Sequence, residues 1–292
     1  MKRSLAGWAF AAPALAVIAL FFVLPVVAAL ALSVTDFDIY ALADRRNLRF
    51  VGLGNYIGLL TNPLFWKALG NTLYFVVVGV PLSIVVSLAA ALLLHSKLAR
   101  FKAFHRTALF APVVTTVVAV AVIWRYLFHT RYGTVNWALS LVGIDPIDWL
   151  GDPHWAMPTI ILFAVWKNYG YNMVIFLAGL QAIPEDLYEA ARIDGAGAWA
   201  QFRHLTLPLL GPVLLVVGIL TMAGYFQLFA EPYVMTQGGP LQSTVSVLYL
   251  MYEEGFKWWN LGNASAVAFL LFVLMSALTS GLLWFARRRG AE

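Results

Sequence analysis

The chain has 292 residues, of which 62% are hydrophobic and only 11% are charged, whereas a soluble domain carries about 25% charged residues. This composition excludes an ordinary soluble domain and indicates a membrane protein. The formal net charge of +5 is explained by basic loops on one side of a membrane and does not indicate nucleic acid binding; the absence of cysteine excludes disulfides, thiol chemistry and thiolate metal sites.

Six almost uncharged runs are long enough to span a bilayer, whose core of about 30 Å requires about 20 apolar residues of helix. They lie at residues 8–32, 72–94, 107–128, 158–181, 209–230 and 263–286. The first is far longer than the apolar region of a signal peptide, so we expect a retained anchor. The sequence therefore predicts an all-α membrane protein with six transmembrane helices.

The distribution of basic residues predicts the orientation, because Lys and Arg resist translocation. Eleven of the 19 basic residues lie on the face shared by both termini, where five acidic residues leave a net charge of +6. These are Lys2, Arg3, Lys97, Arg100, Lys102, Arg106, Arg192, Arg203, Arg287, Arg288 and Arg289. We expect cytoplasmic N- and C-termini in a multi-pass membrane protein.

The segment between the first two spans ends in the amphipathic stretch NPLFWKALGNT. Asn62 can cap a helix and Pro63 can occupy its first turn, while Phe65, Trp66 and Leu69 form an apolar side. We expect this helix to lie along the membrane surface, as an interfacial anchor rather than a binding element.

The whole chain forms one membrane domain with two parts. Residues 1–71 would form an N-terminal anchor with an outer segment, and residues 72–288 a five-helix core with a cytoplasmic loop at 182–208. Two further outer loops, at 130–157 and 231–262, could meet an external partner. The phosphate-binding G-x-x-x-x-G-K-[ST] pattern is absent, so the chain does not contain its own ATPase.

The loop at 182–208 is the most polar stretch in the middle of the chain. Pro184, followed by two acidic residues, favours a helix start. Asp194, Gly195 and Gly197 interrupt this helix, residues 198–206 can form a second one, and Pro208 starts the next span. Because such short helices are marginal in water, we expect the loop to need a partner surface.

The amino-acid sequence of this loop resembles the EAA signature of permease subunits in binding-protein-dependent ABC importers. Glu189-Ala190-Ala191 is followed after three residues by Gly195, and after nine more by Leu205-Thr206-Leu207-Pro208, with Leu205 where the family often has Ile. LAGLQAIPEDLYEAARIDGA (177–196), FVGLGNYIGLLTNPLFWKALGNT (50–72) and TQGGP (236–240) also resemble carbohydrate permeases of the maltose and glycerol-phosphate type.

This resemblance implies a type I ABC importer with the MetI-like permease fold, located in the inner (plasma) membrane of a bacterium. A second homologous permease, two ATPase subunits that bind ATP and Mg, and an extracytoplasmic sugar-binding protein would complete it, and this chain would bind lipid and carbohydrate but no cofactor or metal. The loop would be the coupling helix that sits in a cleft of the ATPase. The implied coupling residues are Glu189, Ala190, Ala191, Asp194, Gly195, Phe202 and Pro208.

Candidate substrate residues lie in the fourth and fifth spans, because polar groups in a span usually face a cavity or another helix. They are Lys167, Asn168 and Tyr171 on one face, Thr221, Gly224, Tyr225 and Leu228 on another, and Gln227, which with Glu231 lies near the outer end. Tyrosines stack on sugars and bond to hydroxyls, and the resemblance implies that these helices line the cavity. Alternatively, Lys167 reaches the outer interface and Asn168 bonds to another helix.

Three other functions compete with this interpretation of the sequence. Another small solute such as glycerol phosphate would suit a permease of this type. A stand-alone secondary transporter usually has inverted repeats or broken intramembrane helices, and the sequence predicts neither. A membrane enzyme using Glu189, Asp194 and His204 lacks support, because the two acids lie on different helical faces and metal-ligand spacings are absent.

Overall fold

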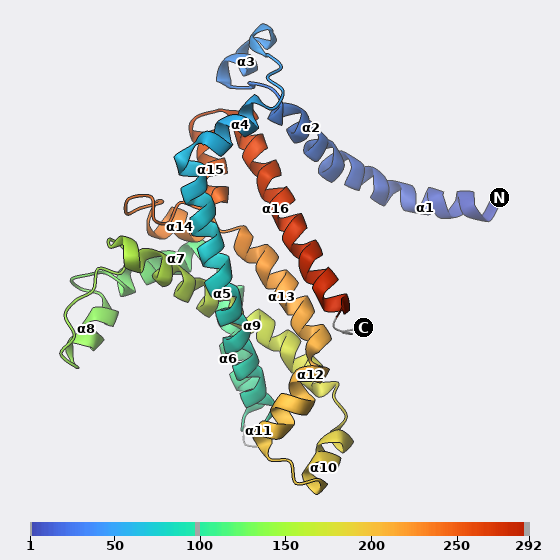
Figure 1. The fold of residues 1–292 in the computed structure, drawn as a ribbon, viewed down its shortest axis with the longest axis vertical. Coiled ribbons are helices and arrows are strands. Elements are labelled where there is room, and N and C mark those ends of the chain that lie inside the picture. The colour runs from blue at the N-terminus through green and yellow to red at the C-terminus, as the bar shows by residue number, and fades with distance from the viewer. Residues whose placement is uncertain (1, 97–99, 289–292) are drawn as a thin grey trace. The chain divides into compact units, whose positions relative to one another are not determined.

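The computed structural model describes residues 2–96 and 100–288, and within these ranges its regular structure is helical apart from one isolated bridge between Thr35 and Phe50. Figure 1 shows its helices as coiled ribbons. Four are long and apolar enough to cross a membrane, and two bent pairs raise the number to six if each pair is one span. The predicted all-α fold is confirmed, while the orientation stays a prediction. Lys97 and Arg289, on which it partly rests, lie outside the described residues.

The chain forms two compact units, and the first comprises residues 1–66 and 250–274. Its elements are α1 (Lys2–Ile18), a π turn (Ala19–Val23), α2 (Leu24–Ser33), α3 (Ile39–Ala43), a 3-10 turn (Arg45–Asn47), α4 (Gly54–Thr61) and a second π turn (Glu253–Lys257). Asn55 ties α4 to the end of α2, since its amide donates to the carbonyls of Ser33 and Thr35 at 2.9 and 2.8 Å.

The second unit comprises residues 67–249 and 275–292. It holds α6 (Lys102–Val114), α7 (Val117–Leu127), α8 (Thr134–Ser140), α9 (Pro153–Gln181), α10 (Glu185–Ile193), α11 (Ala198–Gln201), a π turn (Phe202–Thr206), α12 (Leu207–Leu209), α13 (Gly211–Phe226) and α14 (Ala230–Met235). Three helices belong to both units: α5 (Pro63–His95), α15 (Val247–Tyr252) and α16 (Leu261–Arg288). The division expected near residue 71 remains a prediction.

The core of the second unit lies between α5, α9 and the start of α13. It consists of Leu88, Ala91, Leu94, Met173, Phe176, Leu177, Leu180, Leu210 and Val217. A Cβ at Gly179 would lie 2.8 Å from a Val213 methyl, so glycine permits the close approach of α9 and α13. This packing places the polar faces of α9 and α13 on either side of the cavity described below.

The prediction of a separate surface helix at NPLFWKALGNT is wrong. The Asn62 side chain does accept from the Leu64 backbone N–H at 2.9 Å, as the predicted cap requires. However, the helix that starts at Pro63 continues as one helix to His95, in spite of Pro81 in its interior, so the stretch forms the first turns of a long helix. Phe65 is buried, and Lys67 donates to the carbonyl of Leu241 at 2.6 Å.

The expected third and fifth spans are bent, which contradicts the prediction of unbroken helices. The bend is 97° between α6 and α7 and 67° at the start of α13. Pro112 lacks an N–H for the α6 ladder, and Thr115 and Thr116 are extended. Pro212 similarly leaves the turn at Leu210 without one helical bond, and α13 ends at Phe226, before residue 230.

The fourth span begins five residues earlier than predicted. Asp152 caps α9 by accepting from the backbone N–H of His154 at 2.8 Å, and Pro153 occupies the first helical position. The helix ends at Gln181, which is the C-terminal end predicted for this span.

Candidate functional site

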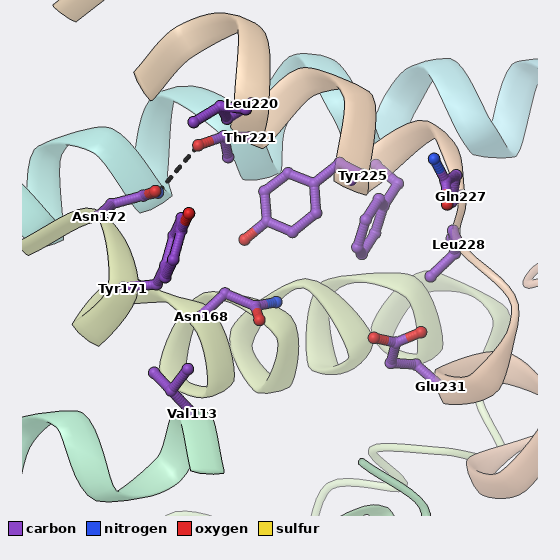
Figure 2. A pocket seen from close by; sticks show the side chains of 12 residues that line it. Val113, Asn168, Tyr171, Asn172, Leu220, Thr221, Tyr225, Gln227, Leu228 and Glu231 are labelled. Atoms are coloured by element: carbon purple, nitrogen blue, oxygen red, sulfur yellow. Dashed lines mark hydrogen bonds between the residues drawn. The ribbon is translucent and has the colours of Figure 1, made fainter. Parts of the chain in front are cut away.

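A cavity of about 380 Å³ lies within the second unit, between α9, α13 and the end of α6. Figure 2 shows side chains from these helices pointing into it. We call it the main cavity. Its lining comprises Phe75, Val113, Asn168, Tyr171, Asn172, Leu220, Thr221, Gly224, Tyr225, Gln227, Leu228 and Glu231. Its size lies in the range of pockets that hold small molecules, and its lining is apolar with a few polar groups.

The structure brings the predicted substrate residues together. Seven of the eight line the main cavity: Asn168, Tyr171, Thr221, Gly224, Tyr225, Gln227 and Leu228. The eighth, Lys167, lines a second space of about 370 Å³, which we call the adjoining cavity. The two cavities share Asn168, Gly224, Gln227 and Glu231, so they are neighbouring parts of one hollow region.

The two tyrosines differ in what they offer a ligand. Tyr171 is 49% exposed, so its ring face is available for stacking. Tyr225 is 5% exposed, and its ring packs edge-on against Phe75 with the centroids 4.9 Å apart. Ser83 is a polar neighbour of the Tyr225 hydroxyl, yet among the described residues this hydroxyl makes no hydrogen bond of normal geometry. Tyr225 therefore offers a buried hydroxyl rather than a ring face (Figure 2).

Asn172 is a lining residue that the sequence reasoning missed. Its amide nitrogen donates to the hydroxyl of Thr221 at 2.9 Å, and the Ser83 hydroxyl lies 3.4 Å away. These bonds connect α9 with α13 and α5 at the wall of the cavity, and Figure 2 shows the one between Asn172 and Thr221. The i, i+4 spacing from Asn168 could have identified Asn172, whereas nothing distinguishes Phe75 among the many aromatic residues of the chain.

Lys167 does not reach the outer interface, in contrast to the alternative considered for it. The side chain is only 7% exposed, and its Nζ donates to the backbone carbonyl of Val113 at 3.0 Å. The bend after α6 leaves this carbonyl without a partner in its own helix. The half-buried Glu231 is the acidic residue that lines both cavities.

The loop at 182–208 contains two short helices joined by a tight turn. At the end of α10, Gly195 has a φ of +79° and donates to the carbonyl of Arg192 at 3.1 Å, while Ala196 donates to Ala191 at 2.9 Å. This bond pair is a Schellman motif, which favours glycine at the left-handed position. The positive φ accounts for glycine at this position, since a Cβ there would meet no atom within 4 Å.

The predicted coupling residues differ in exposure. Glu189, Ala190, Asp194, Gly195 and Pro208 are exposed, and Ala191 and Phe202 are half-buried. Phe202 packs against the core of the second unit, and Pro208 lies in α12 rather than at the start of the next long helix. Two large apolar side chains that the sequence reasoning missed, Ile193 and Trp199, are 86% and 69% exposed.

Residues 2–96 and 100–288 contain no group of three or more His, Asp or Glu side chains that could hold a metal ion. The main cavity is lined by hydrogen-bonding, aromatic and apolar side chains together with the carboxyl group of Glu231. Such a lining binds or passes a solute.

The long apolar helices, together with a cavity whose apolar wall carries a few polar groups, define a multi-pass membrane transport protein. The chain belongs to the family of binding-protein-dependent transport system inner membrane components, whose sequence pattern matches residues 4–290. It is thus an ABC transporter permease subunit, and ATP hydrolysis is carried out by a separate subunit of such transporters. The resemblance to this permease family that the EAA signature indicated is confirmed.

Relatives align over nearly the whole chain. The lactose transport system permease protein of Rhizobium radiobacter is 39% identical over 286 residues, which cover 97% of this chain and 94% of the relative. The trehalose/maltose transport system permease protein of Thermococcus litoralis is 37% identical over 276 residues, covering 94% and 90%.

A solved structure supports the fold. A chain of a bacterial ABC transporter that imports the acidic polysaccharide alginate superposes with a TM-score of 0.82, at 22% identity, over 98% of this chain and 96% of that chain. The MetI-like permease fold expected from the sequence is confirmed.

Proposed function

We propose that this chain is the permease subunit of an ATP-driven sugar importer of the bacterial plasma membrane, and that the main cavity is part of the sugar path. The observation that carries the proposal is the convergence of polar and aromatic residues from α9 and α13 on one hollow region. The transport of lactose and of trehalose or maltose by its relatives supports a carbohydrate as substrate.

The lining chemistry suits an uncharged sugar. Asn168 and Gln227 offer amide groups, and Tyr225 offers a buried hydroxyl that lacks a partner among the described residues. Tyr171 offers a half-exposed ring on which the C–H face of a sugar can stack. Gly224 keeps one wall open, since a Cβ there would meet no atom within 4 Å.

A phosphate ester such as glycerol phosphate fits the main cavity less well. Phosphate sites are usually built from Arg, Lys and helix N-termini, whereas the charged residue lining the main cavity is Glu231. The ammonium of Lys167 faces the adjoining cavity and is already bonded to the Val113 carbonyl. A neutral solute avoids leaving a buried anion without compensation.

The loop at 182–208 serves as the coupling helix in this proposal. Cytoplasmic termini would place it on the side of two ATPase subunits that bind ATP and Mg, while a second permease and an extracytoplasmic sugar-binding protein complete the complex. The exposed side chains of Ile193 and Trp199 support a docking role, because large apolar groups exposed on a short polar loop gain from being covered. Glu189, Asp194 and Gly195 shape the docking surface.

The test is reconstitution of the full complex in liposomes, with sugar-stimulated ATP hydrolysis and sugar accumulation measured together. We expect a neutral saccharide presented by the binding protein to stimulate both. A screen in which only phosphorylated or acidic solutes stimulate hydrolysis would contradict the assignment of substrate class. Cysteine tags near Asp44 and Gly195 check the orientation, since reagent outside intact cells should reach only the first.

A further inference from the structure

The ammonium of Lys167 is bonded to the protein backbone inside the second unit. Its Nζ lies 3.0 Å from the carbonyl oxygen of Val113, and the side chain is buried. Three residues further along α9, a Cβ at Gly170 would lie 2.5 Å from the carbonyl oxygen of Leu109. Positions 167 and 170 of α9 therefore both contact α6.

The end of α6 needs such a partner. The last carbonyls of a helix have no N–H of their own helix to bind, and a positive charge is favoured there because it complements the helix dipole. Thr115 satisfies the neighbouring carbonyl of Pro112 through its hydroxyl at 2.6 Å. Lys167 does the same for Val113 from another helix, so the two side chains together complete the end of α6 at its 97° bend.

This bend lies between the two cavities. Val113, before the bend, lines the main cavity, and Val117, the first residue of α7, lines the adjoining cavity together with Lys167. A displacement of the end of α6 would therefore move a wall of both cavities at once.

We propose that Lys167 is a positioning residue, which fixes the bend between α6 and α7 against α9 and thereby sets the opening between the two cavities. It does so without binding the sugar itself. The inference rests on the proposed sugar path through these cavities. It assigns Lys167 a different role from Asn168 and Gln227, whose side chains line both cavities.

The test uses the absence of cysteine from this chain. Val117→Cys places one thiol beside the bend, and its reaction with a small neutral methanethiosulfonate in the full complex, without sugar, is followed by the mass of this subunit. The reporter is combined with Lys167→Met, which keeps the side-chain length but removes donor and charge, and with Lys167→Arg, which keeps both. Lys102→Met, an exposed lysine in the first turn of α6, is the matched control.

We expect Lys167→Met to change the labelling rate at position 117 by about threefold or more, the effect of removing one hydrogen bond that holds a conformation. Lys167→Arg and Lys102→Met should label within about twofold of the parent. Sugar uptake should fall in Lys167→Met and recover in Lys167→Arg. If Lys167 only binds sugar, Lys167→Met leaves the labelling rate without sugar unchanged. Reduced uptake with an unchanged labelling rate therefore overturns the proposal. The absence of any change in both uptake and labelling rate overturns it as well.

Should Lys167→Met not assemble, Thr115→Val provides the second measurement, because it removes the Thr115 hydroxyl bond to the Pro112 carbonyl and leaves the backbone N–H bond at 3.3 Å in place. Faster or slower labelling at position 117 in this variant supports a bend held by these end contacts, and unchanged labelling contradicts it. Because labelling is measured without sugar, it still tests Lys167 if no sugar proves to be transported. Failure of the positioning role is thus separate from failure of the proposed function.

Discussion

The side-chain hydroxyls of Tyr188 and Thr206 lie 3.0 Å apart and join α10 to the π turn after α11. Thr206 is buried, and its hydroxyl also lies 3.4 Å from the carbonyl oxygen of Gln201, to which it can donate. This bond closes the loop around its exposed glycine turn. It therefore connects the two ends of the loop at 182–208 within this subunit.

Tyr188→Phe should loosen this loop while leaving the spans intact. Loss of one intramolecular hydrogen bond costs about 1 kcal/mol, which corresponds to about a fivefold higher population of the opened loop and, where opening is fast, a similar increase in cleavage rate. Limited trypsin digestion at Arg192 and Arg203, with the ATPase removed, measures it. Tyr126→Phe, an exposed tyrosine of α7, is the control and should not change cleavage. Equal rates in both variants would show that the bond does not hold the loop.

The two cavity tyrosines should respond differently to substitution. Tyr171→Ala removes an exposed ring, so the complex should assemble normally while uptake falls by an amount equivalent to about 1 to 3 kcal/mol. Tyr225→Phe removes only a hydroxyl without a partner among the described residues, so it should leave thermal stability unchanged or slightly higher. Uptake should nevertheless fall if that hydroxyl binds sugar.

Sugar uptake and the melting temperature of the purified complex separate these effects. Tyr225→Ala is not informative, because deleting a buried ring that packs on Phe75 costs about 3 to 5 kcal/mol through the cavity it leaves. Normal uptake in both Tyr171→Ala and Tyr225→Phe would place the sugar path away from the main cavity.

Gly170→Ala should destabilise the second unit. Its Cβ would lie 2.5 Å from the Leu109 carbonyl oxygen, a backbone atom that cannot rotate away, so α6 must move from α9 at a cost of about 1 to 3 kcal/mol. Gly218→Ala in α13 is the matched control, because a Cβ there meets no atom within 4 Å and helix propensity favours alanine by about 1 kcal/mol. Thermal unfolding should shift downward for the first and upward, or not at all, for the second; a reversed order would contradict the close packing.

Much of the fold could be predicted from the sequence because hydropathy and length are local properties. The first, fourth and sixth spans were placed within a few residues, apart from the earlier start of α9 at Pro153. The extension of α5 from residue 72 back to Pro63 was not predicted. An amphipathic stretch can either lie on a membrane surface or extend a span, and only tertiary packing decides between these two positions. The bend after α6 could have been predicted locally, because Pro112 is followed by Thr115 and Thr116.

The residues of the candidate site could be predicted where they share one face of a helix. Contacts between residues of different helices could not be predicted. Tyr171 and Asn168 follow from spacing along α9, and so would Asn172. The contact between Lys167 and Val113 joins positions 54 residues apart through a bend, so no local pattern indicates it. For Gly195 the sequence predicts only an interruption of the helix, whereas the structure shows the cause, a left-handed backbone with open space at the Cβ position.

Gly195 separates a backbone effect from a docking effect. Gly195→Ala tests the backbone alone, since a left-handed φ of +79° costs a residue with a Cβ about 1 to 2 kcal/mol. Gly195→Trp adds a large side chain that meets open space in this subunit. If the ATPase covers this turn, Gly195→Trp should insert in the membrane normally yet lose sugar uptake and co-purification of the ATPase, or retain hydrolysis that sugar cannot stimulate, well beyond the effect of Gly195→Ala.

Gly143→Trp is the matched control for that prediction. Gly143 has a φ of +77° and also has open space around its Cβ position, but it lies in the loop between α8 and α9, which the predicted topology places outside. The backbone cost and the added side chain are therefore the same as at Gly195, and only the partner differs. We expect Gly143→Trp to retain ATPase co-purification and sugar-stimulated hydrolysis. Equal behaviour of the two tryptophan variants in both measurements would reject a docking role for the turn at Gly195, because backbone strain alone would then account for the loss.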